Sequence, residues 1–298
     1  MRITITGVTG FVGSNLFEYF LDNGWEPKSL KIRNPNWKSE IDPNASALIH
    51  LAGKSHDLKN SSNPDQYFDV NTKLTIELFD FFLASNYRDF IFFSSVKAVT
   101  DNAVGVVTEE TITLPKTVYG RSKLQAEQYI LSKTLPQGKR IFIIRPTMIH
   151  GPSNKGNLNL LFKMVSKGFP WPLGAFENQR SFCSIDNVCF VIKQILESGD
   201  ITSGIYNLTD NQAISTNRII ELMAISQNKK AKIHIIPQKI INTLANLGDI
   251  FRLPLNSERL EKLTENFVVS NKKIVKAIGK ELPVSTEDGL MKTFNSFN

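Results

Sequence analysis

Short apolar runs alternate with segments of helical periodicity through the first 150 residues of the chain. Runs of four to six residues rich in Ile, Leu and Phe are typical of the buried strands of a parallel sheet. Such runs predict strands at residues 2–6, 30–33, 47–51, 90–94 and 140–145.

Helical periodicity fills most of the gaps between these strands. Apolar residues from Leu16 to Leu21 recur at helical spacing, and Gly24 is a suitable stop. Further helices are predicted at residues 64–86 and 118–132, whereas the polar link 34–46 is too short for a full crossover helix. Strands that alternate with helices indicate an α/β fold, a Rossmann-type doubly wound parallel sheet.

The pattern changes after Pro146 to short helices and loops. A helix at 187–197 and a strand at 204–208 are expected to return to the sheet, and the remainder is mostly helical with one strand at 232–236. We therefore expect a dinucleotide-binding domain at residues 1–150, joined by residues 187–209. The C-terminal lobe, residues 151–298, is expected to be a smaller, mixed and mostly helical unit that binds substrate.

Composition narrows the class of protein. With 41% hydrophobic and 21% charged residues, the 298-residue chain is typical of a globular protein. Its apolar runs fall short of the ~18 residues that a membrane span needs, and no signal peptide is evident. Two cysteines, Cys183 and Cys189, are too few for a disulfide framework, so we expect them to be reduced in a cytoplasmic protein.

The net charge of +7 favours anionic partners. Its lysines are dispersed and lack interleaved aromatic residues, so nucleic acid is not expected as a partner. The histidines and cysteines lack metal-ligand spacing, so no metal site is expected.

Three glycines, Gly7, Gly10 and Gly13, directly follow the first predicted strand and open the first helix, with Phe11 and Val12 between them. Glycines let the backbone approach a pyrophosphate closely, and the helix N-terminus offers free N–H groups to it. Glycines at this spacing also occur in ordinary turns. Because they stand between a strand and a helix, we expect them to bind a dinucleotide.

The residue that follows the second strand selects between NAD and NADP. A carboxylate there binds the ribose hydroxyls of NAD, whereas an arginine accommodates the 2′-phosphate of NADP. This chain offers no carboxylate and presents Arg33, which makes NADP possible. The alternative interpretation is that Arg33 is a solvated charge at a strand end.

Tyr119 and Lys123 lie one turn apart at the start of a predicted helix. A phenol is a poor acid–base group at neutral pH, and a nearby ammonium group together with a nicotinamidium cation is expected to lower its pKa. Ser95, at the end of the fourth predicted strand, supplies the hydroxyl that such a pair needs. A Tyr-x3-Lys pair alone is common by chance.

Together these motifs resemble the extended short-chain dehydrogenase/reductase family, in its branch of nucleotide-sugar epimerases, dehydratases and reductases. The resemblance covers nearly the whole chain and implies catalytic roles for Ser95, Tyr119 and Lys123. Asn71 resembles a structural asparagine of the family. The positions expected to contact the cofactor are Gly7, Gly10, Phe11, Val12, Gly13, Arg33, Leu51, Ala52, Gly53, Ser94, Tyr119, Lys123 and Pro146.

The resemblance also implies substrate contacts from Ser95 and Tyr119 and, in the C-terminal lobe, from Asn157 and Arg180. Arg180 would bind the diphosphate of a nucleotide-sugar, because a planar bidentate donor suits paired oxygens. Plainer interpretations are a helix cap for Asn157 and a surface charge for Arg180. His56 is expected to contact the sugar. His150 stands where the family usually has an aromatic residue, and we expect it in a loop.

The sequence therefore predicts an enzyme that transfers hydride at C4 of a UDP-sugar through bound NAD, a UDP-sugar 4-epimerase. The alternative is an NADPH-dependent reductase of a UDP-4-keto-6-deoxy-N-acetylhexosamine. A catalytically idle dinucleotide-binding regulator is the least favoured reading, since Tyr119 and Lys123 are both present. A homodimer formed through helices 64–86 and 118–132 is expected from the resemblance.

Overall fold

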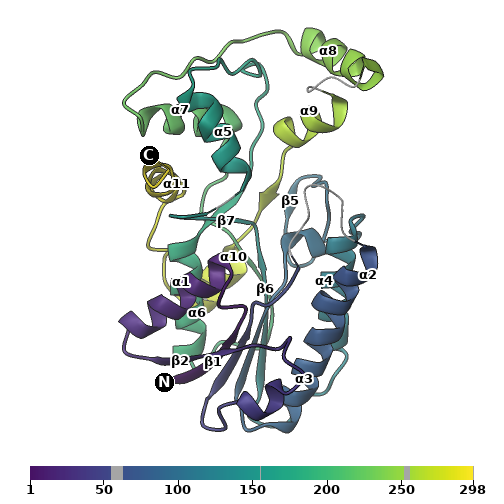
Figure 1. Ribbon diagram of the computed structural model, residues 1–298, viewed down its shortest axis with the longest axis vertical. Coiled ribbons are helices and arrows are strands. Elements are labelled where there is room, and N and C mark those ends of the chain that lie inside the picture. Colours follow the sequence, from purple (N-terminus) through teal and green to yellow (C-terminus); the bar gives the residue numbers. More distant parts are fainter. Residues whose placement is uncertain (55–62, 155, 252–255, 298) are drawn as a thin grey trace.

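A six-stranded parallel sheet forms the centre of the molecule, shown in Figure 1 as a computed structural model. The structure describes residues 1–54, 63–154, 156–251 and 256–297. The strand order is β2-β1-β3-β4-β6-β9. The strands are β1 (Arg2–Thr6), β2 (Glu26–Leu30), β3 (Ala47–His50), β4 (Asp89–Phe93), β6 (Arg140–Pro146) and β9 (Gly204–Leu208).

Helices cover both faces of this sheet. Successive residues of a strand point to opposite faces, and here both sets are apolar. Ile91 and Phe93 pack toward α1 (Phe11–Asp22) and α6 (Ile185–Glu197). Phe90 and Phe92 point the other way, toward α3 (Leu74–Ala84) and α4 (Val118–Leu131). This alternation confirms the predicted Rossmann-type doubly wound fold.

Within the six-stranded sheet, the second strand is the one whose position was predicted wrongly. It spans Glu26–Leu30 and not residues 30–33, and Arg33 lies exposed in the turn that follows. Four of the five residues of β2 are not buried, because it is an edge strand, so the apolar run signal is absent there. The predicted lack of a crossover helix is confirmed, since the link to β3 holds only the short 3₁₀ helix η1 (Trp37–Glu40).

The predicted helix at 64–86 is interrupted. It consists of α2 (Pro64–Phe68), a π-helical turn η2 (Asp69–Lys73) and α3. Turns of this kind occur often at functional sites. Here the π turn holds Asn71, which is fully buried beside the carboxyl ends of the strands.

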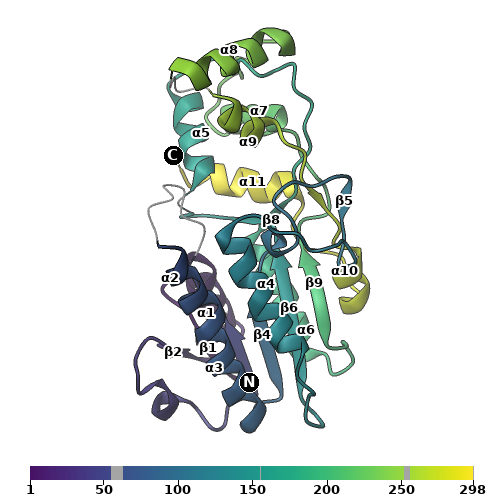
Figure 2. The ribbon, with the colours of Figure 1, turned by 90° about the vertical axis from the view of Figure 1, so that its right-hand side faces the viewer.

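The C-terminal lobe lies above the sheet in Figures 1 and 2 and has its own apolar core. The expected strand at 232–236 is not formed; single bridges join Trp171 to Ile233 and Leu173 to Ile235. The elements of this part are α5 (Asn157–Ser166), α7 (Thr216–Ile225), α8 (Gln238–Phe251), α9 (Ser257–Thr264), α10 (Lys272–Ile278) and α11 (Thr286–Asn295). Short strand pairs join β5 (Val106–Val107) to β10 (Val268–Val269) and β7 (Met148–His150) to β8 (Phe182–Ser184).

Segments from the second half of the chain also pack on the sheet. Cys183 and Cys189 are buried free thiols in the core that covers one sheet face, and Ile274 of α10 joins the same core. His150 is not a loop residue as expected: it ends β7 and is completely buried, with its Nδ1 2.9 Å from Thr293 Oγ1 of α11.

Candidate active site

The carboxyl ends of β1, β3, β4 and β6 meet at one edge of the sheet, below the C-terminal lobe (Figure 1). Most residues predicted to bind a cofactor immediately follow these ends. β1 has β2 on one side and β3 on the other, so the connections after β1 and β3 leave on opposite faces of the sheet. Such a switch point is where open α/β sheets bind their ligands.

The glycine turn after β1 packs so closely against neighbouring backbone that it has no room for side chains. Gly7 has φ +74°, and a Cβ added there would lie 2.6 Å from the Ala52 amide nitrogen. A Cβ on Gly13 would lie 2.2 Å from the Gly7 carbonyl oxygen. Thr6 Oγ1 accepts hydrogen bonds from Leu51 N and Ala52 N at 3.2 and 3.1 Å, which fixes the two loops together.

The first turn of α1 follows directly from this glycine turn. Gly10 is the N-cap of α1, and the cap has no side-chain hydrogen bond to the helix. The amide groups of the first helical turn therefore depend on another partner. A glycine-walled helix N-terminus of this shape fits the diphosphate of a dinucleotide.

We expect Gly7→Ala to abolish cofactor binding and to destabilise the fold well beyond Gly24→Ala. Both glycines have φ near +75°, so the backbone strain of about 1–2 kcal/mol is common to the two variants. Only Gly7 adds a backbone clash, because a Cβ on Gly24 meets no atom within 4 Å. Thermal unfolding and cofactor titration of both variants check this, and equal losses would contradict it.

Ser95, Tyr119 and Lys123 come together at the same edge. Ser95 caps the short 3₁₀ helix η3 (Val96–Ala98) and shares a side-chain hydrogen bond with Tyr119 at the start of α4. The close approach of η3 and α4 requires Gly120, since a Cβ there would lie 2.3 Å from the Lys97 carbonyl oxygen. The structure thus places the three residues predicted to be catalytic in one cluster.

Lys123 is buried between β4 and the loop after β3. Its Nζ donates a 2.8 Å hydrogen bond to the Phe93 carbonyl and lies 4.7 Å from the centre of the Phe92 ring. Burial lowers the pKa of Lys123 to about 8, and the nearby Glu127 opposes this shift. A Cβ on Gly53 would lie 3.3 Å from Lys123 Nζ, so Gly53 leaves the ammonium group room.

The pKa of Tyr119 does not follow the sequence argument. Burial raises it, and the hydrogen bond with Ser95 only partly opposes this effect. Lys123 was expected to lower the pKa of Tyr119, but its ammonium group is directed at the Phe93 carbonyl. Desolvation therefore dominates in the chain by itself.

A buried ion pair beneath the cluster was not predicted from the sequence. Glu127 of α4 accepts bonds from Arg145 Nε and Nη2 at 3.0 and 2.5 Å, and also from Ser94 Oγ. Arg145 and Glu127 are 2% and 1% exposed. The available signal was the spacing of Glu127, one helical turn beyond Lys123 on the same face.

The other predicted positions lie in several elements. Phe11 and Val12 begin α1 half-buried, Pro146 is buried at the end of β6, and Asn157 is exposed at the first position of α5. Asn157 is not the helix cap, because Gly156 occupies that position. His56 lies outside the described residues.

Arg180 lies in the C-terminal lobe among other charged groups. Its guanidinium donates to the Lys262 carbonyl at 3.1 Å and to Glu265 at 3.4 Å. The charges of Arg180, Lys262 and Glu265 all act on the pKa of Lys97, which follows Ser95 by two residues. The backbone of Arg180 is bridged to Phe267, whose ring centre lies 4.3 Å from Lys97 Nζ, and charges of both signs surround this point.

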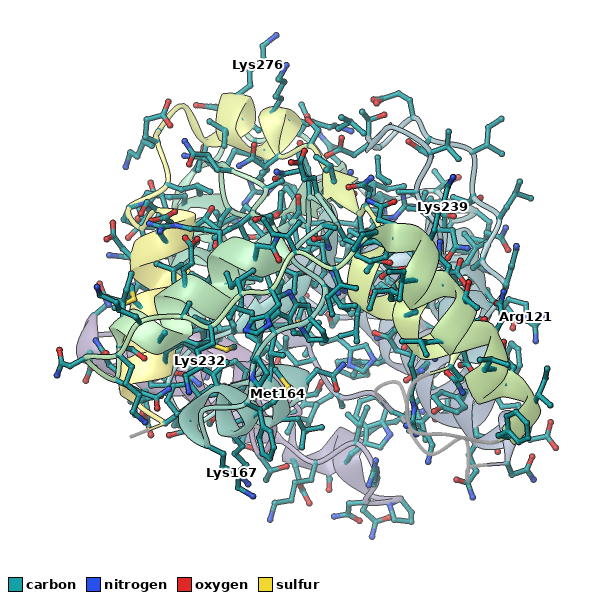
Figure 3. The ribbon with its side chains drawn as sticks, turned by 90° about the horizontal axis from the view of Figure 1, so that it is seen from above. Arg121, Met164, Lys167, Lys232, Lys239 and Lys276 are labelled. Atoms are coloured by element: carbon teal, nitrogen blue, oxygen red, sulfur yellow. The ribbon has the colours of Figure 1, made fainter. Side chains whose placement is uncertain are left out.

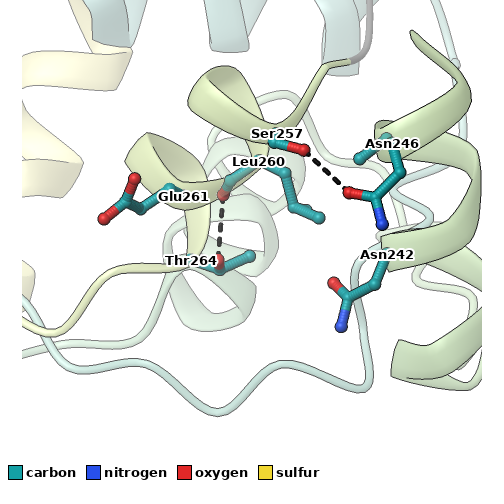
Figure 4. Close-up of a pocket in the computed structure, with 7 residues that line it drawn as sticks. Asn242, Asn246, Ser257, Leu260, Glu261 and Thr264 are labelled. Atoms are coloured by element: carbon teal, nitrogen blue, oxygen red, sulfur yellow. Dashed lines mark hydrogen bonds between the residues drawn. The ribbon is translucent and has the colours of Figure 1, made fainter. Parts of the chain in front are cut away.

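A separate pocket of about 380 Å³ opens between α8 and α9 (Figure 4). Its wall includes Asn242, Asn246 and Ser257, and Ser257 Oγ lies 3.0 Å from Asn246 Oδ1. None of the residues predicted to bind cofactor or substrate lines this pocket.

The sequence profile described as the NAD dependent epimerase/dehydratase family matches residues 3–209. The chain belongs to this family. The match includes the glycine turn and the cluster of Ser95, Tyr119 and Lys123. It confirms the resemblance inferred from the sequence, and it makes the chain a member of an enzyme family.

The relatives of this chain include proteins named as an epimerase and as a reductase. UDP-glucose 4-epimerase of Vibrio cholerae is 27% identical over 323 residues, covering 99% of this chain and 95% of that protein. GDP-6-deoxy-D-mannose reductase of Pseudomonas aeruginosa is 25% identical over 241 residues, covering 75% and 79%.

A solved family structure shares the fold. UDP-glucuronic acid 4-epimerase from Bacillus cereus in complex with NAD superposes with a TM-score of 0.74 at 19% identity, covering 100% of this chain and 98% of that one. Among the residues that our structure describes, no helix has both the length and the apolar character of a membrane span.

Proposed function

We propose that this protein is a UDP-sugar 4-epimerase that works with a retained NAD. The observation that carries the proposal is the meeting of Ser95, Tyr119 and Lys123 beside the glycine turn of Gly7 and Gly13. Proton transfer and cofactor binding are thereby served at one edge of the sheet.

The residues divide the work as follows. Ser95 and Tyr119 hydrogen-bond the oxygen at C4 of the sugar, and Tyr119 takes the hydroxyl proton as that carbon is oxidised. The glycine turn and Lys123 would hold a nicotinamide cofactor here, which would supply the hydride acceptor for C4 and the hydride donor for the return step. Tyr119 then returns the proton to the C4 oxygen as the carbon is reduced again, so the complete cycle causes no net oxidation or reduction.

Lys123 has two roles in this proposal. Its buried ammonium group, held by the Phe93 carbonyl, is placed to donate to the ribose of the nicotinamide cofactor. A positive charge there also favours the phenolate of Tyr119. Because burial raises the pKa of Tyr119 in the chain by itself, a cationic nicotinamide would have to add to the effect of Lys123 on the phenolate.

The second candidate is an NADPH-dependent reductase of a 4-keto-6-deoxy sugar nucleotide. Arg33 favours it, because this exposed cation follows β2 at the place where NAD enzymes usually carry an acid. The short link between β2 and β3 also gives the adenosine half of the cofactor less cover. The reductase named among the relatives is in line with this alternative.

Two measurements on the purified protein separate the candidates. Denaturant release of one NAD per chain, together with interconversion of UDP-hexose C4 epimers, would support the epimerase. Protein that carries no nucleotide and oxidises NADPH only with a 4-keto-6-deoxy sugar nucleotide would reject it. Turnover with neither substrate class would reject both.

We expect Arg180→Ala to raise KM for a UDP-sugar while cofactor affinity stays unchanged. Arg180 is proposed to bind the diphosphate, which is the same in the ground and transition states, so its loss appears in KM. A charge-assisted hydrogen bond of about 1.5–3 kcal/mol corresponds to a roughly 10- to 150-fold increase.

Arg218→Ala is the matched control for Arg180. Arg218 belongs to the same lobe and is also paired with glutamates, Glu221 and Glu287, but it has no predicted contact with substrate. An unchanged KM in Arg180→Ala, or an equal change in both variants, would reduce Arg180 to a structural ion pair.

A further inference from the structure

Two segments of the C-terminal lobe, each followed directly by one acid (Glu177 or Asp249), together carry six positive charges of a chain whose net charge is +7. Residues 156–176 and 226–248 contain six lysines and no Asp or Glu. The other 29 basic residues nearly cancel the 28 acidic ones. We call these two segments together the lysine-rich face. Its cations are Lys163, Lys167, Lys229, Lys230, Lys232 and Lys239.

The two segments lie side by side although they are far apart in sequence. The Trp171 and His234 amides bond to the Lys232 and Trp171 carbonyls at 2.7 and 2.8 Å. Lys229 Nζ donates to the Ser166 carbonyl at 3.0 Å. Figure 3, which looks down on this end of the molecule, shows Lys167 and Lys232 near α5 and Lys239 near the start of α8. The two lysine-bearing segments are therefore neighbours in the folded structure as well as similar in composition.

The same face exposes large apolar side chains. On α8, Ile240, Leu244 and Leu247 follow at intervals of four and three residues, which places them on one side of the helix. They are 51%, 49% and 41% exposed, whereas Ile241 and Ala245 form the buried side. Leu160, Phe169 and Ile235 are also exposed on this face, and Ile235 is 79% exposed.

α8 carries Lys239 at its start and Asp249 near its end, and the other five lysines lie outside this helix in the same lobe. An exposed apolar helix side combined with nearby lysines is similar to the pattern of a helix that lies in a membrane interface. From these observations we infer that the lysine-rich face docks on an anionic lipid bilayer. Ile240, Leu244 and Leu247 would enter the interface, and the six lysines would meet the lipid phosphates. This inference goes beyond the proposed function and does not depend on it.

The charge distribution argues against two other occupants. In a symmetric dimer the same face meets itself, so this contact would bring six lysines against six lysines. Nucleic acid would also attract the lysines, but its phosphates offer no partner for exposed Leu and Ile side chains. An anionic bilayer offers phosphates to the lysines and an apolar interior to the exposed Leu and Ile side chains.

Vesicle flotation tests the inference. We expect the full chain to float with vesicles of phosphatidylcholine and phosphatidylglycerol, to stay behind with phosphatidylcholine alone, and to be released by high salt. Leu244→Glu and the double variant Lys229→Glu with Lys230→Glu should each lower the bound fraction at least about tenfold.

Two variants control for exposure and charge. Leu131→Glu changes a leucine that is also 49% exposed, but on α4 of the other unit. Lys272→Glu with Lys276→Glu removes the same charge from α10. Both controls should bind vesicles normally, and thermal unfolding and turnover should confirm that all four proteins are folded.

Three results would overturn the inference. These are failure of the full chain to float at low salt, an equal loss of binding in the control variants, and a concentration-dependent dimer that Leu244→Glu dissociates. The last result would assign the face to a second copy of the chain. Since turnover is measured on soluble substrate, failure of the vesicle test leaves the proposed epimerase reaction intact.

Discussion

Tyr119→Phe is expected to lower kcat at least ~100-fold while the protein folds and retains its cofactor. The variant removes only the phenolic oxygen, which is proposed to carry the proton at C4. Its structural contribution is the hydrogen bond shared with Ser95, worth about 1 kcal/mol. Interconversion rates, bound nucleotide and the unfolding midpoint of the same preparation measure the three quantities separately.

Tyr129→Phe provides a control on the same helix. Tyr129 also uses its hydroxyl, which donates to Asp80 at 2.8 and 3.0 Å, but it lies away from the Ser95 cluster. This variant should keep normal turnover. If Tyr119→Phe retained near-normal kcat, Tyr119 would have no place in the mechanism.

Glu127→Ala is expected to lower the free energy of unfolding by about 3–5 kcal/mol, since it leaves the Arg145 charge buried without its partner. Glu127 also accepts from Ser94, so a second buried polar group loses its acceptor. Denaturant unfolding of the variant measures this loss.

Two comparisons show whether burial causes the effect. Glu258→Ala removes the acid of an exposed pair with Lys262 and should leave the free energy of unfolding nearly unchanged, because solvent screens this pair. Replacing both buried partners, Glu127→Met with Arg145→Met, should recover part of the loss because no unpaired charge remains. A loss below about 1 kcal/mol in Glu127→Ala would contradict the view of a desolvated pair.

Most of the sheet was predictable because its strands are buried on both faces. The apolar runs at β1, β3, β4 and β6 follow directly from that burial. The same reasoning misplaced β2, since an edge strand with sequence Glu-Pro-Lys-Ser-Leu carries no apolar run. The π turn at Asn71 was also missed, because one extra residue in a turn leaves the helical periodicity almost unchanged.

The candidate site was predictable where a chemically suitable residue follows a predicted strand or begins a predicted helix. Gly7, Ser95, Tyr119 and Lys123 each follow a strand or begin a helix, and parallel strands bring such positions to one edge. Glu127 and Arg145 pair across 18 residues, and their contact depends on how α4 packs on β6. The local sequence pattern does not reveal how this helix packs on this strand, so the ion pair could be identified only from the structure.

The position of α10 has a consequence for how the protein is made. The sheet is completed by β9 at residue 208, but α10, which packs on β9 and α6, begins only at Lys272. At translation rates of roughly 5–20 residues per second, the nascent sheet waits several seconds with this flank bare. This flank of the core can therefore close only well after β9 has been synthesised, once α10 has emerged from the ribosome.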